Sequence, residues 1–513
     1  MPDEQQRKEN SIGKVWLVGA GPGEEGLLTI KGREVLEEAE TVVYDALVGK
    51  AILSMIPEKA EVLYVGKRAG NHAMVQEEIN AQLLKMAREG KRVVRLHGGD
   101  PFLFGRGAEE LELLEENQVP FEVVPGVPSA IAVPSYCGIP VTHRDFCSSL
   151  HIITGHQKKG EPLHIDFQAL TQMGGTLVFL MGLSSLPVIC SGLLAAGMSE
   201  QMPAAVLSQG TGAGQHSVVA TLSTLVQETQ KQQVLTPAII VVGEVCKLSK
   251  QFNWYEKMPL FGTRLILTRP RERSRTLAQK LRRLGAEVWE VPTISTVPRR
   301  KETALDEALE KLSGEGRKWL VFTSPAGVRI FWQKLSEKKR DVRSLGRVKI
   351  AVLGAGTCRE LEEHGIYADL MPEKYDGQTL GRLLGEQVMD GDYLAIPRAS
   401  QGNPELIREI VARKKVQIDD IPLYDTVYEK LPWISPGDIL GEDTRASLYA
   451  VFTSSSTVKG FAELAGKIDF TRVRAVCIGR QTQEAALALG MEAVMSNEAT
   501  VDSLVEKIIE LRR

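Results

Sequence analysis

The sequence predicts an α/β protein made of several compact units. Short runs rich in valine, isoleucine and leucine, such as residues 93–97 and 264–268, alternate with longer amphipathic segments. This alternation is typical of sheets whose strands are joined by helices. Several runs end directly before glycines or charged residues, which is where parallel sheets usually bind ligands. A chain of 513 residues is also too long for one ordinary domain.

The composition is that of an ordinary folded protein. Hydrophobic residues make up 43% and charged residues 25%, which argues against long disordered segments. Lysine and arginine are spread along a chain of net charge −3, so we expect no nucleic-acid partner and no membrane partner. The six cysteines lack metal-ligand spacing, so we expect reduced thiols, no metal and a cytoplasmic protein. The polar first fourteen residues predict neither a signal peptide nor a membrane span.

Residues 15–18 form the first predicted strand, and a glycine loop follows it. The loop GAGPG occupies residues 19–23 and precedes an amphipathic segment at 27–40. The order of strand, glycine loop and helix suggests a dinucleotide site, but GAGPG is not the GxGxxG pattern of such sites. Pro22 fixes the backbone and removes a hydrogen-bond donor. The sequence therefore disfavours a dinucleotide-binding loop.

Charged residues follow two further predicted strands, and a glycine loop follows a third. The strand at 41–45 ends in Asp45, and the strand at 62–66 runs into Lys67. The run at 93–97 is followed by Gly98, Gly99 and Asp100, and the glycines let a ligand approach the backbone closely. Because the carboxyl ends of parallel strands meet at one sheet edge, we expect a ligand site there. Solvated loop positions are the alternative for the two charges.

The second half of the chain contains an internal repeat. It begins after residues 247–262, which show no clear period, and VFTSPAGVRIF at 321–331 returns as VFTSSSTVKGF at 451–461. The repeat predicts two similar α/β lobes with a cleft between them. Hydroxyl residues stand where each strand gives way to a helix, namely Thr323, Ser324, Thr453 and Ser454. These hydroxyls can cap the helices or contact an anionic ligand.

A series of motifs over residues 15–245 resembles the uroporphyrinogen-III C-methyltransferases of the tetrapyrrole methylase family. In order, the motifs are VGAGPG, YDALV, YVGKRAGNHAMVQEEI, RLHGGDPFLFGRGAEE, VVPGVPSA, YCGIPVTHR, TGH and PAIIVVGEV. Several motifs in register are far more specific than any one of them. The resemblance implies two α/β lobes with S-adenosylmethionine folded in the cleft between them, and a homodimer formed through this half.

The same resemblance implies roles for individual residues. Asp45 and Lys67 become the catalytic acid–base pair. The residues around the cofactor are Pro22, Gly98, Gly99, Asp100, Leu103, Pro128, Ser129, Met181 and Gly210. Met181 could instead fill a core, and Gly210 could be only a turn glycine.

Two residues depart from the family pattern. His97 stands where the family usually has lysine, and Pro128 stands where it usually has a small hydroxyl residue. We expect the first departure to change how a substrate carboxylate is held, because a neutral imidazole is a weaker partner for an anion than an ammonium. We expect the second departure to remove a contact to the cofactor.

Methyl transfer to a pyrrole carbon depends mainly on positioning. A sulfonium methyl group is already a strong electrophile and a reduced pyrrole is electron-rich, so the protein must align them and exclude water. A proton must then leave the ring, and a carboxylate such as Asp45 can take it. The carboxylate arms of the substrate could meet Lys67 and the cations of neighbouring motifs, namely Arg68, Arg106, His143 and Arg144. For each of these four neighbouring cations, a surface position without a ligand is the alternative.

The second half resembles the uroporphyrinogen-III synthases over roughly residues 264–511. The segments that carry this resemblance are LTRPRERSRTLAQKLRRLGAEV, VFTSPAGV, VLGAGT, IPLYDTVYE, VFTSSSTV and CIGRQT. It implies two flavodoxin-like lobes that cyclise hydroxymethylbilane without a cofactor. Tyr424 would donate a hydrogen bond to the departing hydroxyl, although a packed tyrosine is the alternative. Thr482 would lie near the cleft, and Arg269 would bind substrate carboxylates.

The two resemblances together predict a bifunctional enzyme that closes hydroxymethylbilane to uroporphyrinogen III and methylates it twice to precorrin-2, the entry to sirohaem and cobalamin. The predicted domains are a methylase at 13–250, a linker at 251–262 and a synthase at 263–513. The synthase lobes would comprise about 263–297 with 428–513, and about 298–427. Two alternatives stay open: a methylase that acts on another corrin-type intermediate, and a second half that binds a tetrapyrrole without converting it.

Overall fold

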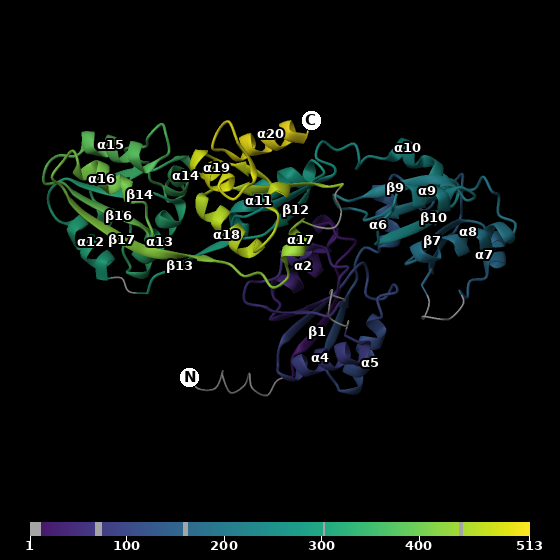
Figure 1. The fold of residues 1–513 in the computed structure, drawn as a ribbon. Coiled ribbons are helices and arrows are strands. Elements are labelled where there is room, and N and C mark those ends of the chain that lie inside the picture. The colour runs from purple at the N-terminus through teal and green to yellow at the C-terminus, as the bar shows by residue number, and fades with distance from the viewer. Residues whose placement is uncertain (1–11, 67–73, 157–162, 301–302, 441–444, 513) are drawn as a thin grey trace. The chain divides into compact units, whose positions relative to one another are not determined.

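The computed structural model describes residues 12–66, 74–156, 163–300, 303–440 and 445–512. It divides into two compact units, of which the first comprises Met1–Pro292 with Lys430–Arg513 and the second comprises Thr293–Glu429. Three five-stranded sheets belong to the first unit and one to the second. Helices cover the sheets (Figure 1), which confirms the predicted α/β class.

The first sheet is fully parallel and carries the loops predicted to bind a ligand. Its strands, in sheet order, are β3 (Glu61–Tyr64), β2 (Thr41–Tyr44), β4 (Arg92–His97), β1 (Lys14–Gly19) and β5 (Phe121–Val124). Its helices include α2 (Ile30–Glu37), α4 (Gln76–Arg88) and α5 (Gly107–Glu116). Valine and leucine side chains of β1 and β4 are fully buried, because helices cover both faces of the sheet. The four strands predicted around Asp45 and Gly98 are confirmed.

The second sheet is mixed, with four of its strands paired antiparallel. In sheet order the strands are β6 (Leu150–Thr154), β7 (Thr176–Leu180), β10 (Ala238–Val242), β8 (Pro203–Ser208) and β9 (His216–Thr221). Only β6 and β7 pair in parallel. The connection from β8 to β9 is too short for the crossover that parallel strands need. The helices of this part of the chain are α6 (Ser129–Tyr136), α7 (Phe167–Met173), α8 (Leu186–Ala195) and α9 (Leu225–Lys231).

An aromatic cluster follows the second sheet. After the short helix α10 (Ser249–Phe252), the rings of Trp254 and Tyr255 pack against Tyr136 of α6 at centroid distances of 5.0 and 4.8 Å. Tyr255 also contacts Phe261 at 5.5 Å and is only 5% exposed. This connecting segment is therefore packed against α6 even though its sequence shows no helical or strand period.

The third sheet, at the end of the first unit, is fully parallel. Its strands, in sheet order, are β12 (Glu287–Glu290), β11 (Thr263–Leu267), β18 (Ser447–Phe452), β19 (Arg474–Cys477) and β20 (Glu492–Met495). The helices are α11 (Arg271–Arg283), α17 (Pro436–Leu440), α18 (Ser455–Ala465), α19 (Arg480–Leu487) and α20 (Val501–Arg512). Numbered within the lobe, the strand order is 2-1-3-4-5, which is the flavodoxin-like order predicted for this half.

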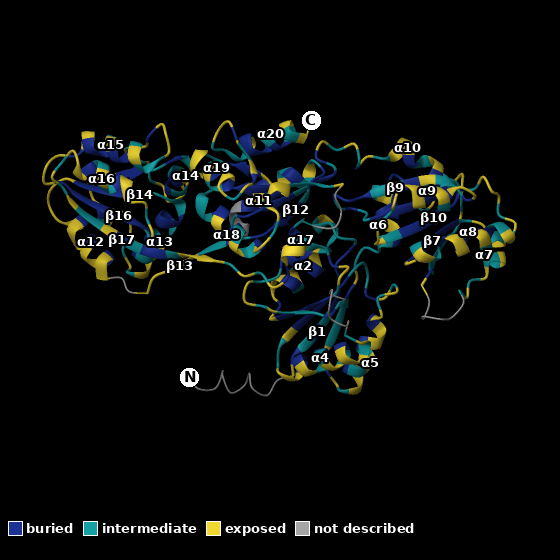
Figure 2. Cartoon of the chain, in the orientation of Figure 1, coloured by how far each residue is buried: buried dark blue, intermediate teal, exposed yellow. Residues whose placement is uncertain are grey.

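The second unit contains one sheet, and its strand order differs from that of the third sheet because an antiparallel strand occupies one edge. In sheet order its strands are β13 (Ile294–Pro298), β17 (Gln417–Tyr428), β16 (Tyr393–Ala399), β14 (Lys318–Phe322) and β15 (Lys349–Val352). All neighbours pair in parallel except β13 with β17. The helices are α12 (Thr303–Ser313), α13 (Pro325–Glu337), α14 (Ala355–Glu363), α15 (Gly377–Gln387) and α16 (Glu405–Val411). In Figure 2 the strands are mostly buried and the helices expose one side.

No helix in the described part of the chain combines the length and the apolar character that crossing a bilayer requires.

Candidate active sites

Two glycine loops of the first sheet are joined by backbone hydrogen bonds at its carboxyl edge. Gly99 N donates to Gly21 O at 2.8 Å, and Gly21 N donates to Gly99 O at 3.1 Å. These bonds tie the loop after β1, which contains Pro22, to the loop after β4. The structure therefore brings together two of the loops that the sequence placed at one edge.

The loop after β5, which contains Gly126, contacts the first two loops and explains why they need glycine at the contact. A Cβ atom added at Gly126 would lie 2.2 Å from Gly99 O, and one at Gly19 would lie 2.4 Å from Gly126 N. Such distances to backbone atoms leave no room for any side chain. Gly99 also has φ +72°, in the left-handed region that favours glycine. Three backbone segments are thus packed at the closest possible approach.

Asp100 holds two of these loops in place. Its Oδ1 accepts a hydrogen bond from Phe102 N at 2.8 Å, and its Oδ2 accepts one from Gly126 N at 3.0 Å. Both carboxylate oxygens are therefore engaged by backbone amides. Asp100 connects the loop after β4 to the loop that leads into α6, where Pro128 is the N-cap and Ser129 the first helical residue.

The turn after Asp100 has an unusual backbone. Phe104 and Arg106 both adopt positive φ angles, of 56° and 61°, although neither is glycine. The side chains of Phe102 and Phe104 are 58% and 44% exposed, while the predicted cofactor contact Leu103 is half-buried. Strained backbone and exposed aromatic rings are features that often accompany ligand sites.

Met181 and Gly210 belong to the loops that follow β7 and β8 of the second sheet. Met181 directly follows β7, has φ 54° and is 48% exposed, so it does not fill a core. A Cβ atom at Gly210 would lie 2.4 Å from the Val133 side chain in α6, so glycine is needed here for close packing and not only for a turn. The neighbouring Thr211 lies near Gly23 of the first glycine loop, with its Oγ1 3.7 Å from the position of a Cβ there.

Asp45 lies at the same edge, directly after β2. Its Oδ1 accepts a hydrogen bond from Leu47 N at 3.0 Å, and its Oδ2 faces Arg95 Nη1 at 3.2 Å. Its loop lies against the loop after β4, because a Cβ at Gly98 would be 2.4 Å from the Cβ of Leu47. The Asp45 side chain is 24% exposed, so a ligand can reach it. Lys67 and Arg68 lie outside the described residues.

A buried cluster of polar side chains contacts Asp45 through Arg95, and sequence reasoning missed it. Arg95 Nε contacts Glu110 Oε1 at 3.1 Å, and His97 Nε2 contacts Glu110 Oε2 at 3.0 Å. Gln76 also donates to Glu110 Oε1 at 3.2 Å. Burial alone would raise the pKa of Glu110, but the hydrogen bond from His97 and the charge of Arg95 lower it below its usual value.

His97 therefore does not meet a substrate carboxylate, which corrects the expectation from the sequence. Its side chain is 2% exposed and faces Glu110 of α5. The physical reason is the period of the strand: residues 95 and 97 of β4 point to the same face, and that face is covered by α5. The alternating polar residues in an otherwise apolar strand were the signal that could have revealed the cluster.

Two of the other cations proposed for substrate binding, Arg106 and His143, have local partners. Arg106 pairs with Glu109 at 2.6 Å on the exposed start of α5. His143 Nδ1 lies 3.9 Å from the Asp145 carboxylate. Neither contact points to a ligand.

In the third sheet, the predicted hydroxyl residues lie at strand ends, and one of them caps a helix. Ser454 caps α18 by accepting a hydrogen bond from Thr457 N at 3.3 Å, as the capping alternative expected. Thr453, directly after β18, is half-buried. Arg269 follows β11 and is half-buried, and Thr482 of α19 is 5% exposed.

In the second unit, Ser324 and Tyr424 form one hydrogen-bonded pair. Ser324 caps α13 by accepting from Gly327 N at 3.1 Å, and its hydroxyl lies 2.7 Å from the Tyr424 hydroxyl. Tyr424 is 5% exposed, and burial raises the pKa of its phenol, against smaller opposing effects of Ser324 and Arg329. Thr323, directly after β14, is half-buried beside them in sequence. The sequence predicted both members of the pair but not their contact.

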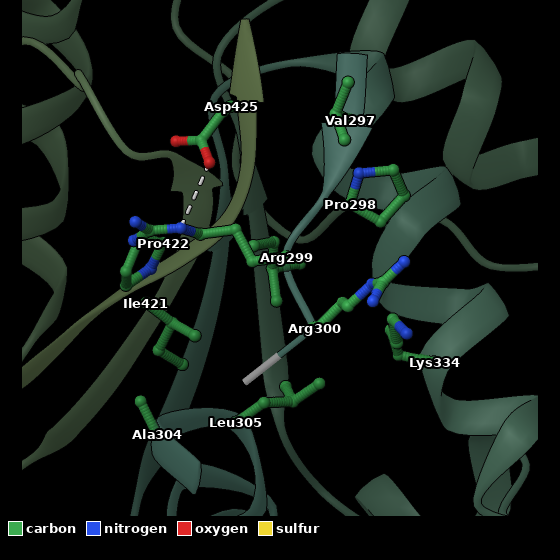
Figure 3. Close-up of a pocket in the computed structure, with 11 residues that line it drawn as sticks. Val297, Pro298, Arg299, Arg300, Ala304, Leu305, Lys334, Ile421, Pro422 and Asp425 are labelled. Carbon is green, nitrogen blue, oxygen red and sulfur yellow. Dashed lines mark ion pairs between the residues drawn. The ribbon is translucent and has the colours of Figure 1, made fainter. Parts of the chain in front are cut away.

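A cavity of about 480 Å³ lies elsewhere in the second unit (Figure 3). Residues of β13, β17, α12 and α13 line it, and Arg299 pairs there with Asp425 at 3.2 Å. None of the predicted site residues lines this cavity, although Leu423 and Asp425 are the sequence neighbours of Tyr424. It is therefore not the site that the sequence predicted.

Two family models match this chain, one in each half. Residues 14–226 match the family model described as Tetrapyrrole (Corrin/Porphyrin) Methylases. Residues 275–506 match the model described as Uroporphyrinogen-III synthase HemD. The two matches do not overlap, and they follow the order that the motifs predicted.

Curated relatives match between about half of the chain and nearly all of it. A porphyrin biosynthesis protein HemD of Ruminiclostridium josui is 46% identical over 97% of this chain and 98% of its own length. A uroporphyrinogen-III C-methyltransferase of Bacillus subtilis is 40% identical over 69% of this chain and 72% of its length. A siroheme synthase of Stutzerimonas stutzeri is 46% identical over 48% of this chain and 53% of its length.

Among solved structures, a uroporphyrin-III C-methyl transferase from Thermus thermophilus, complexed with S-adenyl homocysteine, is 37% identical. It covers 46% of this chain and 99% of its own, with a TM-score of 0.40.

Proposed function

We propose a reaction for each half of the chain on one premise: the chain belongs to the tetrapyrrole methylase family over its first half and to the uroporphyrinogen-III synthase family over its second. The second half closes hydroxymethylbilane to uroporphyrinogen III. The first half methylates that product twice, which gives precorrin-2. The observation that carries this proposal is that both families occur on one chain, because the product of one reaction is the substrate of the other.

The methyl donor that we propose is S-adenosylmethionine. The residues present suit it, because Gly19, Gly99 and Gly126 let the loops after β1, β4 and β5 pack backbone to backbone, and because space is left beside Gly99, where the nearest atom to an added Cβ would be Ser129 N at 3.8 Å. When bound, the donor supplies an electrophilic methyl group on a sulfonium. The residues that would hold it are Pro22, Gly98, Gly99, Asp100, Leu103, Pro128, Ser129, Met181 and Gly210.

Asp45 is our candidate for the proton acceptor. Its carboxylate lies beside the Gly98 loop, is partly exposed, and is oriented by Leu47 N and Arg95. After the pyrrole carbon has gained a methyl group, the ring must lose a proton, and a carboxylate held in reach of that proton can take it. We also propose Lys67 as the partner of Asp45 in the acid–base pair, and only the family resemblance supports that role.

Tyr424 is our candidate for the hydrogen-bond donor in ring closure. The raised pKa of its phenol keeps the proton on oxygen at neutral pH, so the group can donate to a departing hydroxyl. Ser324 lies within hydrogen-bond distance and can orient the phenol. We propose Arg269, Thr323, Ser324, Thr453, Ser454 and Thr482 as substrate contacts.

For the organisation of the chain we propose a methylase at 13–250, a linker at 251–262 and a synthase at 263–513. The synthase lobes would be about 263–297 with 428–513, and about 298–427. We further propose a cytoplasmic homodimer formed through the methylase half.

The test is a reaction of the purified full chain with hydroxymethylbilane and S-adenosylmethionine, followed by mass spectrometry of the oxidised products. We expect a dimethylated macrocycle of the type III isomer. Unmethylated type III product would contradict the assignment of the first half. Type I product, which forms by spontaneous closure, would contradict the assignment of the second half, and uroporphyrinogen III added directly then tests the first half by itself.

A further inference from the structure

A continuous series of polar side chains in contact leads from the core of the first sheet to Asp45. It runs from His97 Nε2 to Glu110 Oε2 at 3.0 Å, from Glu110 Oε1 to Arg95 Nε at 3.1 Å, and from Arg95 Nη1 to Asp45 Oδ2 at 3.2 Å. The side chains of Glu110, His97 and Arg95 are 0%, 2% and 5% exposed, whereas that of Asp45 is 24% exposed. Of these four side chains, solvent therefore reaches mainly that of Asp45.

Stability alone does not account for this arrangement. A buried ionic cluster loses the hydration of each charge, and well-packed apolar residues in its place usually stabilise a fold as well or better. The other buried residues of β4 follow that rule, because Val93, Val94 and Leu96 are apolar. Arg95 and His97 break it, and both face the same carboxylate. The cluster therefore points to a purpose beyond packing, and its exposed end is Asp45.

The geometry of Arg95 shows how the inner groups reach Asp45. A guanidinium is planar, so two of its bonds fix the direction of the remaining donors. Glu110 holds Nε, and Leu96 O accepts from Nη1 at 2.5 Å. With these two contacts in place, Nη1 faces the Asp45 carboxylate. Glu110 is held in turn by His97 on its other oxygen and by Gln76.

We propose that Glu110 and His97 are positioning residues for methyl transfer, which fix the Asp45 carboxylate through Arg95. This inference rests on the proposed function of Asp45 as the proton acceptor. Neither residue touches the substrate. Without His97, Glu110 loses the contact on one of its oxygens and can turn away from Arg95 Nε. The guanidinium is then free to rotate, and the Asp45 carboxylate loses its fixed orientation.

The proposal also gives the residue at position 97 a chemical requirement. The position needs a donor that reaches the buried Glu110 carboxylate, and either an imidazole or an ammonium can supply one. A lysine there would serve the same carboxylate, so His97→Lys is the conservative substitution. A leucine of similar size would leave Glu110 without that partner.

The experiment measures methylation of added uroporphyrinogen III by the full-length chain, so that ring closure does not limit the rate. The variants are His97→Leu, His97→Lys and Glu110→Gln, with Glu112→Gln as a matched control on the exposed side of α5. We expect His97→Leu and Glu110→Gln to lower kcat about tenfold to hundredfold, because small misplacements of a reacting group have effects of that order. The KM for the substrate and the Kd for S-adenosylmethionine should change by less than about threefold.

His97→Lys should restore most of the lost kcat, and Glu112→Gln should behave as the wild type. A role in stability only would lower the Tm of His97→Leu without a selective loss of kcat, and that result would overturn the proposal. If His97→Leu does not fold, Glu110→Gln, which keeps the shape of the side chain, decides the question in the same way.

Asp45→Asn in the same assay separates the two levels of inference. If Asp45→Asn keeps full turnover, the proposed function of Asp45 is wrong. If Asp45→Asn is inactive while His97→Leu and Glu110→Gln keep wild-type kcat, only the proposed positioning role of His97 and Glu110 is wrong.

Discussion

The hydroxyl oxygens of Ser324 and Tyr424 lie 2.7 Å apart, although 100 residues separate them in the sequence. Ser324 belongs to the turn between β14 and α13, and Tyr424 belongs to the long strand β17. Tyr424 can accept from Ser324 and still donate its own proton elsewhere. The pair therefore offers one oriented donor at the end of the sheet in the second unit.

We predict that Tyr424→Phe slows the formation of uroporphyrinogen III. Loss of a positioned proton donor costs about 10²-fold or more in rate when the donor acts in the transition state. The measurement is the initial rate of hydroxymethylbilane consumption with the methyl donor omitted, with separation of the type I and type III products. Tyr428→Phe is the matched control, because Tyr428 lies on the same strand and is 43% exposed.

An unchanged rate for Tyr424→Phe would show that Tyr424 packs in the core and takes no part in ring closure. Ser324→Ala should slow the reaction less than Tyr424→Phe, because the phenol stays in place. It should also lower the free energy of unfolding by about 1 kcal/mol, since it removes the cap of α13.

A second prediction concerns the acid stability of the first sheet. Lys14 and Lys31 both pair with Glu122 of β5, and their hydrogen bonds lower the pKa of that carboxyl to about 2. Because the folded pKa lies below the ordinary value, the carboxylate contributes stability above an ordinary glutamate pKa and loses that contribution as the pH falls toward about 2. Glu122→Gln should therefore have a lower Tm than wild type at pH 6, and the difference should shrink below pH 4. A difference in Tm that does not depend on pH would contradict this assignment.

A third prediction concerns the cysteines. Burial raises the pKa of Cys190 to about 11 and the pKa values of Cys246 and Cys477 to about 12, and it raises the pKa of Cys137 as well. Because the thiolate is the reactive form, these four thiols should react slowly in the native protein. Cys147 and Cys358 are less buried and should be labelled first. Mass mapping after timed alkylation at pH 8 checks this order, and early labelling of Cys246 would contradict it.

Local patterns predicted much of the first site, and the reason is physical. Asp45 and the Gly98 loop each follow a strand directly, so the rule that parallel strands share a carboxyl edge is enough to place them together. The contact of Gly99 with Gly126 needed the fold, because no local pattern shows that two loops approach within van der Waals distance.

The buried cluster of Arg95, His97 and Glu110 was missed, although the alternation of Arg95 and His97 in β4 indicated a polar face. Arginine and glutamate are usually exposed, and nothing local shows that α5 covers this face. The antiparallel pairs of the second sheet were missed for a similar reason. Short apolar strands look alike in either direction, and only the length of their connections distinguishes them.

The glycine at position 126 provides the most direct test of the cofactor loops. In Gly126→Ala the new methyl group would lie 2.2 Å from Gly99 O, and neither backbone can yield without moving the Asp100 contact to residue 126. Strain of this kind costs about 1–3 kcal/mol, which corresponds to a loss of roughly tenfold to hundredfold in affinity if the loops bind the methyl donor. Calorimetry with S-adenosylmethionine measures the Kd. Gly437→Ala is the control, because its nearest atom would be 3.9 Å away and its φ is ordinary. Wild-type affinity in a folded Gly126→Ala protein would show that the cofactor binds away from these loops.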